Sequence, residues 1–253
     1  MLAAERRNEV LAQLREEGRV IVADLSKKYN VTEETIRRDL EKIEHDGFAE
    51  RTYGGAVLKE NEKEELPFFV RKRANVKAKK SIAVAIGEQI KDGDHIMLDA
   101  STTALFVAKQ IRHKNNITVI TNSIEILLEL GDRKDWKILS TGGALKVGAL
   151  SLVGYQAERM VDRFHVDKAI VSCKGVDYHK GFTDSNELEA SIKQQMLSAA
   201  TLKIMAVDSA KFEKISFAKI VGFSDIDIIA TEYEMNEGWK EKMQECHVQL
   251  LKA

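Results

Sequence analysis

The chain has 253 residues, a formal net charge of −1 and 44% hydrophobic residues. Its length allows one large domain or a small domain followed by a medium one, and its composition excludes a disordered chain. The near-neutral charge argues against a general polyanion binder, although DNA recognition needs only a local positive cluster. Since no apolar run could span a membrane, no signal peptide is evident and two cysteines give no ligand spacing, we expect a cytoplasmic protein without a membrane partner, metal or cofactor.

The first 58 residues predict short helices. In ERRNEVLAQLREEG, Val10, Leu11 and Leu14 share one face, and Gly18 follows as the residue that ends the helix. A second short helix is expected in VADLSKKYN, with Leu25 facing inward. The turn after it, YNV, is as short as a helix-turn-helix requires.

A third helix is predicted after this turn. Thr32 is placed to cap its N-terminus, and the helix ends near Gly47. Ile36, Leu40 and Ile43 recur at positions i, i+4 and i+7, which forms one buried stripe. The order of helix, helix, tight turn and capped helix is that of a helix-turn-helix.

Two adjacent arginines in this third helix are candidates for reading DNA. If Ile36 faces the core, Arg37 and Arg38 lie about 100° and 200° around the helix, so both point outward. A guanidinium can hold a phosphate or a guanine edge with two hydrogen bonds, and the N-terminal end of a recognition helix meets base edges. Helix spacing equally allows a solvated face with the pairs Glu34–Arg38 and Arg37–Glu41. The candidate positions for DNA contact are Thr32, Thr35, Arg37 and Arg38.

A hairpin and a charged segment follow the third helix. FAERTYGGAVL alternates weakly, and its Gly54-Gly55 pair suits the turn of a wing, with Arg51 and Tyr53 as candidates for backbone contacts to DNA. Residues 59–77 are predicted to be a charged linker, acidic at KENEKEE and basic at RKRANVKAKK, with Pro67 between. A helix is expected to carry the basic run, and a solvated linker and a contact to DNA are equally open interpretations of this segment.

From Ser81 onward the pattern changes to alternating strands and helices. Short apolar strands are predicted in HIMLDAS, ITVITNS, WKILSTGG, DKAIVSC and LKIMAVDS. Helical runs such as TALFVAKQIR, SIEILLEL and NELEASIKQQMLSAA lie between most of them. This order predicts a mainly parallel sheet covered on both faces. We therefore divide the chain into a domain at 1–58, a linker at 59–77 and an α/β domain at 78–253.

Small polar loops follow three of the predicted strands. The first runs into a helix, whose N-terminus offers hydroxyl and N–H groups to an anion, although such a loop by itself is most often a helix cap. Glycines in the third let a backbone approach a ligand closely. Because strand ends of an open α/β sheet share one crevice, we expect the loops to converge. Their polar and glycine positions are Ser101, Thr102, Thr103, Thr121, Asn122, Ser123, Thr141, Gly142 and Gly143.

Charged residues follow the later strands. Lysines there can neutralise a phosphate, and carboxylates can hold sugar hydroxyls. For Lys174 and Lys211, just past strand ends, we favour contact with a ligand. The alternative for Glu187, Glu189 and Lys193 is an exposed position on a helix, which we favour for Glu189. The charged candidates are Lys174, Asp177, Asp184, Glu187, Glu189, Asp208 and Lys211.

Both halves resemble one protein family. VIVADLSKKYNVTEETIRRDLEKIEHDGFAERTYGGAVL resembles the N-terminal winged helix-turn-helix of DeoR-type bacterial transcription regulators. LDASTTALFVAKQI, TVITNSIEI, STGGAL and DSAKF resemble the C-terminal sensor domain of the same family. The resemblance implies that Thr35, Arg37 and Arg38 lie on the DNA-reading helix. It also implies an α/β fold class, with a winged helix-turn-helix followed by a mainly parallel sensor domain similar to ribose-5-phosphate isomerase.

The resemblance further implies an effector and its contacts. A phosphorylated sugar or a related intermediate is the expected effector. The DASTT loop, which includes Ser101, Thr102 and Thr103, and Lys211 would meet its phosphate. The residues implied to line the rest of the site are Asp99, Asn122, Gly142, Gly143, Lys174 and Asp184.

Two functions from different classes compete. The first is a homo-oligomeric repressor, dimer or tetramer, that binds double-stranded operator DNA of a sugar-catabolism operon and is relieved by the sugar phosphate. The second is an isomerase-like enzyme with an appended DNA-binding domain, for which Asp177, Asp184 and Glu187 are the candidate bases. We favour the regulator, with no catalytic residue, because a pure enzyme has no use for the first domain. Structural roles rather than metal binding are expected for His95, His113, His165 and Cys173.

Overall fold

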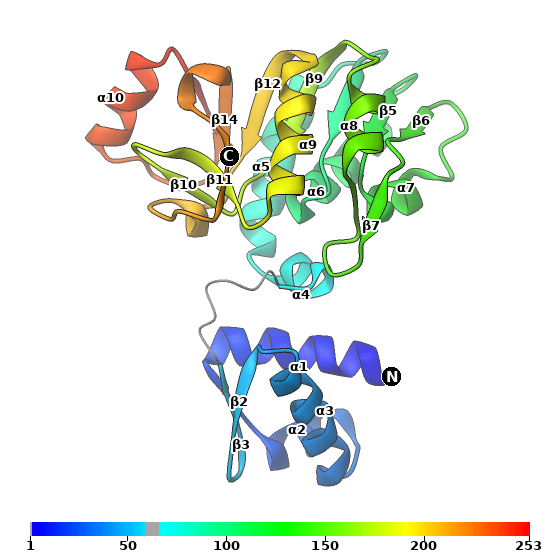
Figure 1. The fold of residues 1–253 in the computed structure, drawn as a ribbon, viewed down its shortest axis with the longest axis vertical. Helices are drawn as coiled ribbons and strands as arrows, with labels where there is room; N and C mark the ends of the chain where they lie inside the picture. Colours follow the sequence, from blue (N-terminus) through cyan, green and yellow to red (C-terminus); the bar gives the residue numbers. More distant parts are fainter. Residues whose placement is uncertain (1, 59–65) are drawn as a thin grey trace. The chain divides into compact units, whose positions relative to one another are not determined.

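The computed structural model describes residues 2–58 and 66–253, except the side chains of residues 15 and 16. The chain forms two compact units, Met1–Ala74 and Asn75–Ala253, which are described separately (Figure 1). The acidic part of the predicted linker, residues 59–65, lies outside the described residues.

The first unit is a small helical domain with a three-stranded antiparallel sheet in the order β1-β3-β2. Ile36, Leu40 and Ile43 are at most 3% exposed, which confirms the predicted stripe. Gly18 ends the first helix with a φ of 72°. The elements are α1 (Ala3–Glu17), β1 (Arg19–Ile21), α2 (Val22–Tyr29), α3 (Glu33–His45), β2 (Ala49–Thr52), β3 (Gly55–Leu58) and α4 (Phe68–Arg73).

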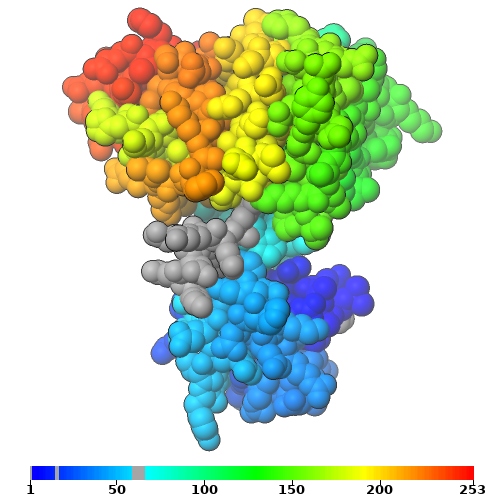
Figure 2. All heavy atoms as spheres, in the orientation of Figure 1, coloured from blue at the N-terminus to red at the C-terminus, as the bar shows by residue number. Residues whose placement is uncertain are grey.

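The β2–β3 hairpin turns one residue earlier than predicted. Its loop is Tyr53-Gly54, and Gly55 already belongs to β3, where it pairs with Ile21 of β1. A Cβ at Gly55 would lie 1.9 Å from the carbonyl oxygen of Val20, so only glycine allows β1 to pack here. The hairpin tip stands out from the surface of the first unit (Figure 2).

The basic part of the predicted linker is largely helical. Helix α4 begins after Pro67 and buries Phe68 and Val70, each 1% exposed. Val70 joins the hydrophobic core of the first unit. Nη1 of Arg73 lies 3.2 Å from a carboxylate oxygen of Glu9 on α1, so α4 is part of this unit.

The second unit contains the remaining described elements. Its helices are α5 (Val76–Gln89), α6 (Thr102–Gln110), η1 (Ile111–His113), α7 (Ile124–Leu130), α8 (Tyr155–Val161), α9 (Glu187–Ser198), η2 (Ser209–Lys211), η3 (Phe223–Asp225) and α10 (Glu237–Glu245). Its strands are β4 (His95–Leu98), β5 (Thr118–Thr121), β6 (Lys137–Ser140), β7 (Ala144–Lys146), β8 (Ser151–Val153), β9 (Val166–Val171), β10 (Gly175–Asp177), β11 (Gly181–Asp184), β12 (Ala200–Ala206), β13 (Ala218–Val221), β14 (Ile228–Thr231) and β15 (Gln249–Lys252).

A seven-stranded parallel sheet organises this unit. Its order is β15-β14-β12-β9-β4-β5-β6, so the direction of chain progress reverses between β4 and β9. Helices α5, α6 and α7 cover one face, and α8 and α9 cover the other (Figure 1). This architecture confirms the predicted fold class. Ligands of open parallel sheets bind beyond the carboxyl ends of the strands, at such a reversal.

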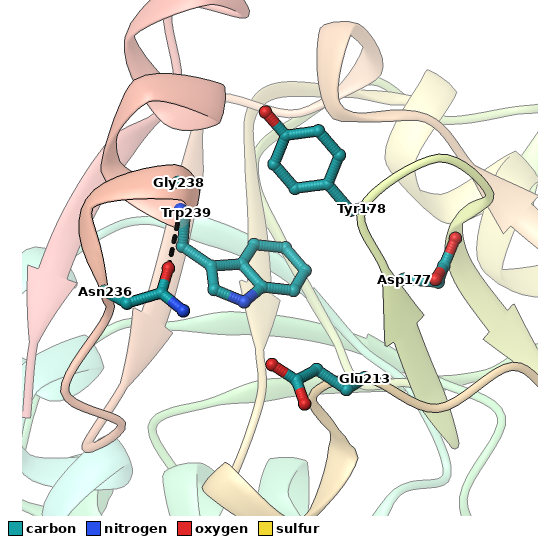
Figure 3. Close-up of a pocket in the computed structure, with 6 residues that line it drawn as sticks. All are labelled: Asp177, Tyr178, Glu213, Asn236, Gly238 and Trp239. Atoms are coloured by element: carbon teal, nitrogen blue, oxygen red, sulfur yellow. Dashed lines mark hydrogen bonds between the residues drawn. The ribbon is translucent and has the colours of Figure 1, made fainter.

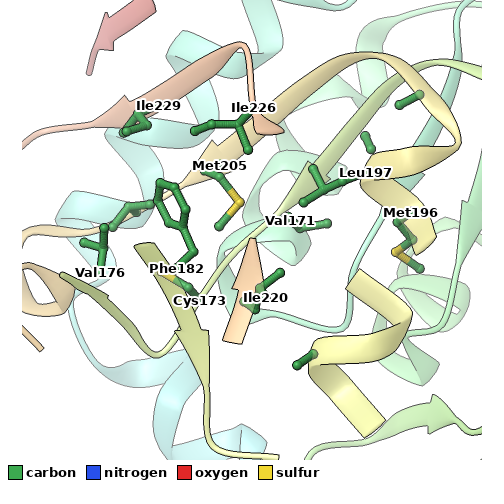
Figure 4. Packing of buried hydrophobic residues seen from close by; sticks show 14 of the residues in the cluster. Val171, Cys173, Val176, Phe182, Met196, Leu197, Met205, Ile220, Ile226 and Ile229 are labelled. Atoms are coloured by element: carbon green, nitrogen blue, oxygen red, sulfur yellow. The ribbon is translucent and has the colours of Figure 1, made fainter. Parts of the chain in front are cut away.

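The core between the sheet and α9 is continuous and apolar. Strand residues such as Val171 and Met205 pack with Met196 of the helix and with Phe182 of the small β10-β11-β13 sheet (Figure 4). All four side chains are fully buried. This packing fixes α9 and the small sheet against the carboxyl ends of β9 and β12.

Candidate functional site

The N-terminal end of α3 is capped as the sequence predicts. The Thr32 hydroxyl accepts the backbone N–H of Thr35 at 3.3 Å, and the two hydroxyl oxygens are 2.9 Å apart. Glu33 and Glu34 occupy the first turn, where negative charge stabilises the helix dipole. The candidate DNA-reading residues are therefore presented on a well-formed helix end.

Both arginines of α3 point outward and pair with acids one turn earlier. Arg37 donates to Glu33 at 2.6 Å and Arg38 to Glu34 at 3.3 Å. Of the two pairs expected for a solvated face, Glu34–Arg38 forms and Arg37–Glu41 does not, because Arg37 reaches the helix start instead. The Arg38 side chain is 74% exposed. Exposed pairs of this kind stabilise a helix by only about 0.3–0.5 kcal/mol, so a DNA phosphate or base can replace the glutamates.

The hairpin places its two candidate residues differently. Arg51 donates from Nε to Glu44 of α3 at 2.6 Å, and the hydrogen bond to Glu44 raises the pKa of this guanidinium. Tyr53 is fully exposed at the hairpin tip. Arg51 therefore also fixes the hairpin against α3, whereas Tyr53 has no such role among the described contacts.

A buried ion pair orients α3 from its other face. Nε of Arg6 on α1 donates to Asp39 at 2.5 Å, and Arg7 approaches the same carboxylate at 3.7 Å. Sequence reasoning did not single out this pair. The signal was available, because Asp39 lies three residues after Ile36 and falls on the buried stripe.

In the second unit, Asp99 lies where the sheet order reverses. It follows β4 and is completely buried. One carboxylate oxygen accepts the backbone N–H of Ser101 at 3.1 Å, and the other accepts that of Ser172, just after β9, at 3.0 Å. Asp99 therefore joins the two central strand ends and shapes the loop that leads into α6.

Lys193 of α9 brings Asp99 and Asp184 together. Its Nζ donates to Asp184 at 2.5 Å and to the Ser172 carbonyl at 2.9 Å, and it lies 3.3 Å from Asp99. Burial alone would lower the pKa of Lys193, but the surrounding carboxylates outweigh it and raise this pKa above 10.5. The lysine is therefore a buried cation that lies between two predicted effector-site aspartates and compensates one of their two negative charges.

Glu189 of α9 is buried, so the prediction of an exposed position is wrong. It is 5% exposed and accepts hydrogen bonds from Lys146 at 2.7 Å and from Ser151 at 3.0 Å. The signal was again helical spacing, since Glu189 and Lys193 share a stripe with Met196. An acid and a base one turn apart on an apolar stripe indicate a buried network.

Some hydroxyl groups in the polar loops after the strands cap helices. Ser101 caps α6 by accepting the N–H of Ala104 at 3.0 Å, and Ser123 caps α7 in the same way. The hydroxyls of Thr102 and Thr103 form no hydrogen bond with the described residues, although both residues are at most 4% exposed. The two serine hydroxyls therefore have a structural role as helix caps, and the two threonine hydroxyls are available to a ligand.

Asn122, after β5, has an unsatisfied acceptor. Its Nδ2 donates to the Leu152 carbonyl at 3.1 Å, which orients the amide. Its buried Oδ1 has no partner within residues 2–58 and 66–253. After β6, Gly142 and Gly143 both have positive φ, and a Cβ at Gly143 would lie 2.6 Å from the Val153 carbonyl oxygen. These positions require glycine and leave backbone open at the same sheet edge.

The later strand ends add charge to this edge. Asp208 begins η2 and accepts the side-chain amide of Asn75 at 3.1 Å. Burial raises the pKa of the Cys173 thiol to about 12, and the nearby cations Lys211 and Lys193 act in the opposite direction. Both lysines therefore lie within electrostatic reach of one thiol. Lys174 lies beside it, and its backbone N–H donates to Thr183.

Two family models match the chain over these two sites. A model of the DeoR-like helix-turn-helix domain matches residues 6–62, and a model of the DeoR C terminal sensor domain matches residues 74–233. The chain belongs to the DeoR family of transcriptional regulators.

Relatives along nearly the full chain carry regulator names. This DeoR-family chain is 40% identical to YulB of Bacillus subtilis, named an uncharacterized HTH-type transcriptional regulator, over 92% of this chain and 90% of that one. It is 32% identical to a putative aga operon transcriptional repressor of Escherichia coli, over 90% and 86%. It is also 32% identical to an L-fucose operon activator of Haemophilus influenzae, over 89% and 91%.

Solved structures match part of this DeoR-family chain. Ribose 5-phosphate isomerase A of Methanocaldococcus jannaschii aligns with a TM-score of 0.38 and 15% identity, over 53% of each chain.

The three carboxylates considered as enzymatic bases are not gathered in this DeoR-family chain. Asp184 is neutralised by Lys193, and Glu187 lies exposed in the first turn of α9. Asp177 lines a separate pocket that contains neither of them. The described residues hold no cluster of three or more possible metal ligands. None of the helices in the described ranges is long and apolar enough to cross a membrane.

Proposed function

We propose that this chain is a repressor of a sugar-catabolism operon, and that a phosphorylated sugar bound in its second unit lowers its affinity for operator DNA. The observation that carries the proposal is the buried Oδ1 of Asn122, an acceptor without a partner among the described residues. A ligand hydroxyl is the group that satisfies such an acceptor. The relatives named for the aga operon and for L-fucose support a sugar as the metabolic context.

The phosphate is proposed to bind at the N-terminus of α6. The first N–H groups of a helix have no partner within the helix, and its dipole favours an anion there. Thr102 and Thr103 add hydroxyl donors, and Lys211 adds a cation that forms no ion pair with the described residues. The proposed lining is completed by Asp99, Asn122, Gly142, Gly143, Lys174 and Asp184.

Two of these residues act differently from the others in the proposal. Asp99 and Asp184 are fully buried and held by Lys193. They shape the loops after β4 and β11, and Lys193 compensates one of their two negative charges at the base of the site. A doubly charged phosphate therefore meets Lys211 and helix N–H groups rather than two free carboxylates.

The first unit is proposed to read operator DNA through α3. Thr32, Thr35, Arg37 and Arg38 lie at the end of the helix that enters the major groove, and Arg51 and Tyr53 contact the backbone beside it. The exposed pairs with Glu33 and Glu34 keep the arginines extended, and they lower attraction to DNA of any sequence. Specific contacts then decide binding.

A homo-oligomer, dimer or tetramer, is proposed to present paired first units to a repeated operator. The sugar phosphate favours a conformation whose paired units no longer match the half-site spacing. A coupling free energy of about 1–3 kcal/mol, typical of allosteric proteins, suffices for induction.

The enzyme alternative is tested by assaying aldose–ketose interconversion of several sugar phosphates. We expect no turnover, because the candidate bases are ion-paired or lie apart. Turnover that Asp184→Asn abolishes would overturn the proposal that the chain is only a regulator.

The effector is tested by thermal unfolding with a panel of phosphorylated trioses, pentoses and hexoses. A ligand present at 100 times its dissociation constant stabilises the folded state by about 2.7 kcal/mol, so a true effector raises the melting temperature. Lys211→Ala should remove the increase. Lys214→Ala, an exposed lysine three residues away, is the matched control and should keep it. Equal shifts in both variants would contradict the assigned phosphate contact.

A further inference from the structure

The second unit has a pocket of about 290 Å³ that none of the predicted effector contacts line. It is lined by Asp177, Tyr178, Glu213, Asn236, Gly238 and Trp239 (Figure 3). These residues come from the end of β10, the segment after η2 and the start of α10. The volume suits a small ligand rather than a single water molecule.

Trp239 presents its indole N–H donor to this pocket. The residue is 3% exposed, and its ring packs against Tyr178, Phe212 and Phe223. Its indole nitrogen lies on the pocket side, between Asn236 and Glu213 (Figure 3). This N–H makes no hydrogen bond with the described residues, and it is not among their fully buried atoms that lack a partner. It is therefore open to the pocket, where a ligand acceptor can bind it in place of water.

Acceptors and a further donor surround this N–H. The Oδ1 of Asp177 accepts the backbone N–H groups of His179 and Lys180, which fixes the carboxylate, while its Oδ2 makes no hydrogen bond with the described residues. Glu213 is exposed and makes no hydrogen bond to any described residue. Asn236 caps α10 with Oδ1, which leaves its Nδ2 as a donor at the pocket.

We propose that this pocket binds an uncharged sugar or polyol, separately from the proposed phosphorylated effector. Paired carboxylates accept hydrogen bonds from neighbouring hydroxyls, the indole N–H donates to a hydroxyl oxygen, and the Tyr178 ring offers an apolar surface to C–H groups. A hydroxyl-rich neutral molecule uses all of these groups at once.

The charge of the pocket decides between ligand classes. Its described lining has two carboxylates and no cation, which disfavours a phosphate, although Lys242 lies outside the lining at 5.1 Å from the centroid of the Tyr178 ring. An ammonium ligand would satisfy the carboxylates, but it has no acceptor for the Trp239 N–H. This pocket therefore favours neutral ligands. The proposed phosphate site at the N-terminus of α6, with Lys211, instead favours anions.

Binding can be read from Trp239 itself. The chain has two tryptophans, so Trp136→Phe leaves Trp239 as the sole indole reporter. D-glucose, D-galactose, D-ribose, D-mannitol and glycerol are titrated into this variant, and calorimetry repeats the measurement with Trp136 intact. At least one should give a saturable emission change. Glu213→Gln should weaken its binding about tenfold, as expected for loss of one charge-assisted hydrogen bond.

Further variants separate this site from others. Trp239→Phe removes the indole N–H together with part of the ring, and it should weaken binding of the same sugar in calorimetry. Glu237→Gln, on the exposed first turn of α10 outside the pocket lining, is the matched control and should change nothing. The inference is overturned if no neutral sugar saturates, if tetramethylammonium saturates the pocket instead, or if sugar binding is lost in Lys211→Ala but kept in Glu213→Gln. None of these outcomes bears on the phosphorylated effector, whose own test uses α6 and Lys211.

Discussion

The two units use pairs of opposite charge in contrasting ways. On α3 of the first unit, Arg38 and Glu34 meet at the surface with side chains 74% and 62% exposed. In the second unit, Lys193 is 8% exposed and lies between two aspartates that are completely buried. The surface pair is open to solvent and is proposed to exchange for DNA, whereas the buried network positions loops.

The energies of the two kinds of pair differ by severalfold. An exposed pair contributes about 0–1 kcal/mol to stability, because water and salt screen it. Removal of one partner from a buried pair costs about 3–5 kcal/mol, because the remaining charge is left without compensation. The loss of stability should therefore be several kcal/mol larger, about 3–5 against 0–1, when a partner of the buried pair is mutated than when a partner of the exposed pair is mutated.

Lys193→Met should have the largest effect on stability. It leaves Asp99 and Asp184 buried without a cation and should lower the free energy of unfolding of the second unit by about 3–5 kcal/mol in urea titrations. Lys240→Met, which removes a surface pair with Glu237, is the control and should cost less than 1 kcal/mol, roughly the maximum for exposed pairs. Equal losses of unfolding free energy in the two variants would contradict the proposed difference between buried and exposed pairs.

The same network predicts an alkaline transition. The folded-state pKa of Lys193 lies above 10.5, because the attraction of Asp184, Asp99 and Glu189 exceeds the effect of burial. Its contribution to stability is thus complete below pH 10.5 and lost as pH rises through the folded-state pKa. The stability difference between the wild type and Lys193→Met should be constant at neutral pH and shrink only in this alkaline range. A difference that already shrinks near neutrality would rule out the raised pKa.

The first unit has one buried pair of its own, which sharpens the comparison. Arg6→Ala should destabilise this unit by about 3 kcal/mol, the lower end of the range for buried pairs, because Arg7 stays 3.7 Å from Asp39. Hydrogen exchange of the α3 amides measures the loss. Arg19→Ala, at an exposed arginine of β1, is the control and should leave this exchange unchanged.

Arg38→Ala should affect DNA binding rather than folding. Loss of a bidentate base contact should weaken operator binding by about 1–3 kcal/mol, with stability nearly unchanged. Binding to an operator duplex, measured by fluorescence anisotropy, tests this. Lys42→Ala, an exposed residue in the last turn of the same helix, should have a smaller effect. Unchanged sugar-phosphate binding in Arg38→Ala would show that the second unit is intact.

Glu33→Gln should give the smallest change. Loss of its pair with Arg37 should cost at most about 0.5 kcal/mol of stability. Affinity for non-operator DNA should rise and depend more steeply on salt, because one more positive charge is available to phosphates. Affinity that falls at every salt concentration would instead assign Glu33 a direct role in binding.

Local patterns made much of the fold predictable. The stripe of Ile36, Leu40 and Ile43, the Thr32 cap and the apolar strands each depend on neighbours within a few residues. Strand β1 was not predicted, because its three residues are stabilised by pairing with β3, more than thirty residues later. The same pairing explains why Gly55 lies in a strand rather than in the predicted turn.

The candidate site was predictable in its loops but not in its charged framework. Polar residues after the predicted strands indicated which edge of the sheet carries the candidate site. Glu189 was misjudged and the role of Lys193 was left open, because charged helical residues are usually exposed and the partners of these two come from other elements. Asp184 ends β11 and Asp99 follows β4, so only the tertiary fold shows that one lysine lies between both.

The central claim is that a sugar phosphate in the second unit controls DNA binding by the first. The direct measurement is anisotropy titration of a duplex selected from random sequence by the purified chain, with and without the sugar phosphate that raises its melting temperature. The account predicts affinity weakened about 5- to 150-fold by the ligand, the range of a 1–3 kcal/mol coupling, and no weakening in Lys211→Ala. Affinity that the bound sugar phosphate leaves unchanged in the wild type would contradict it.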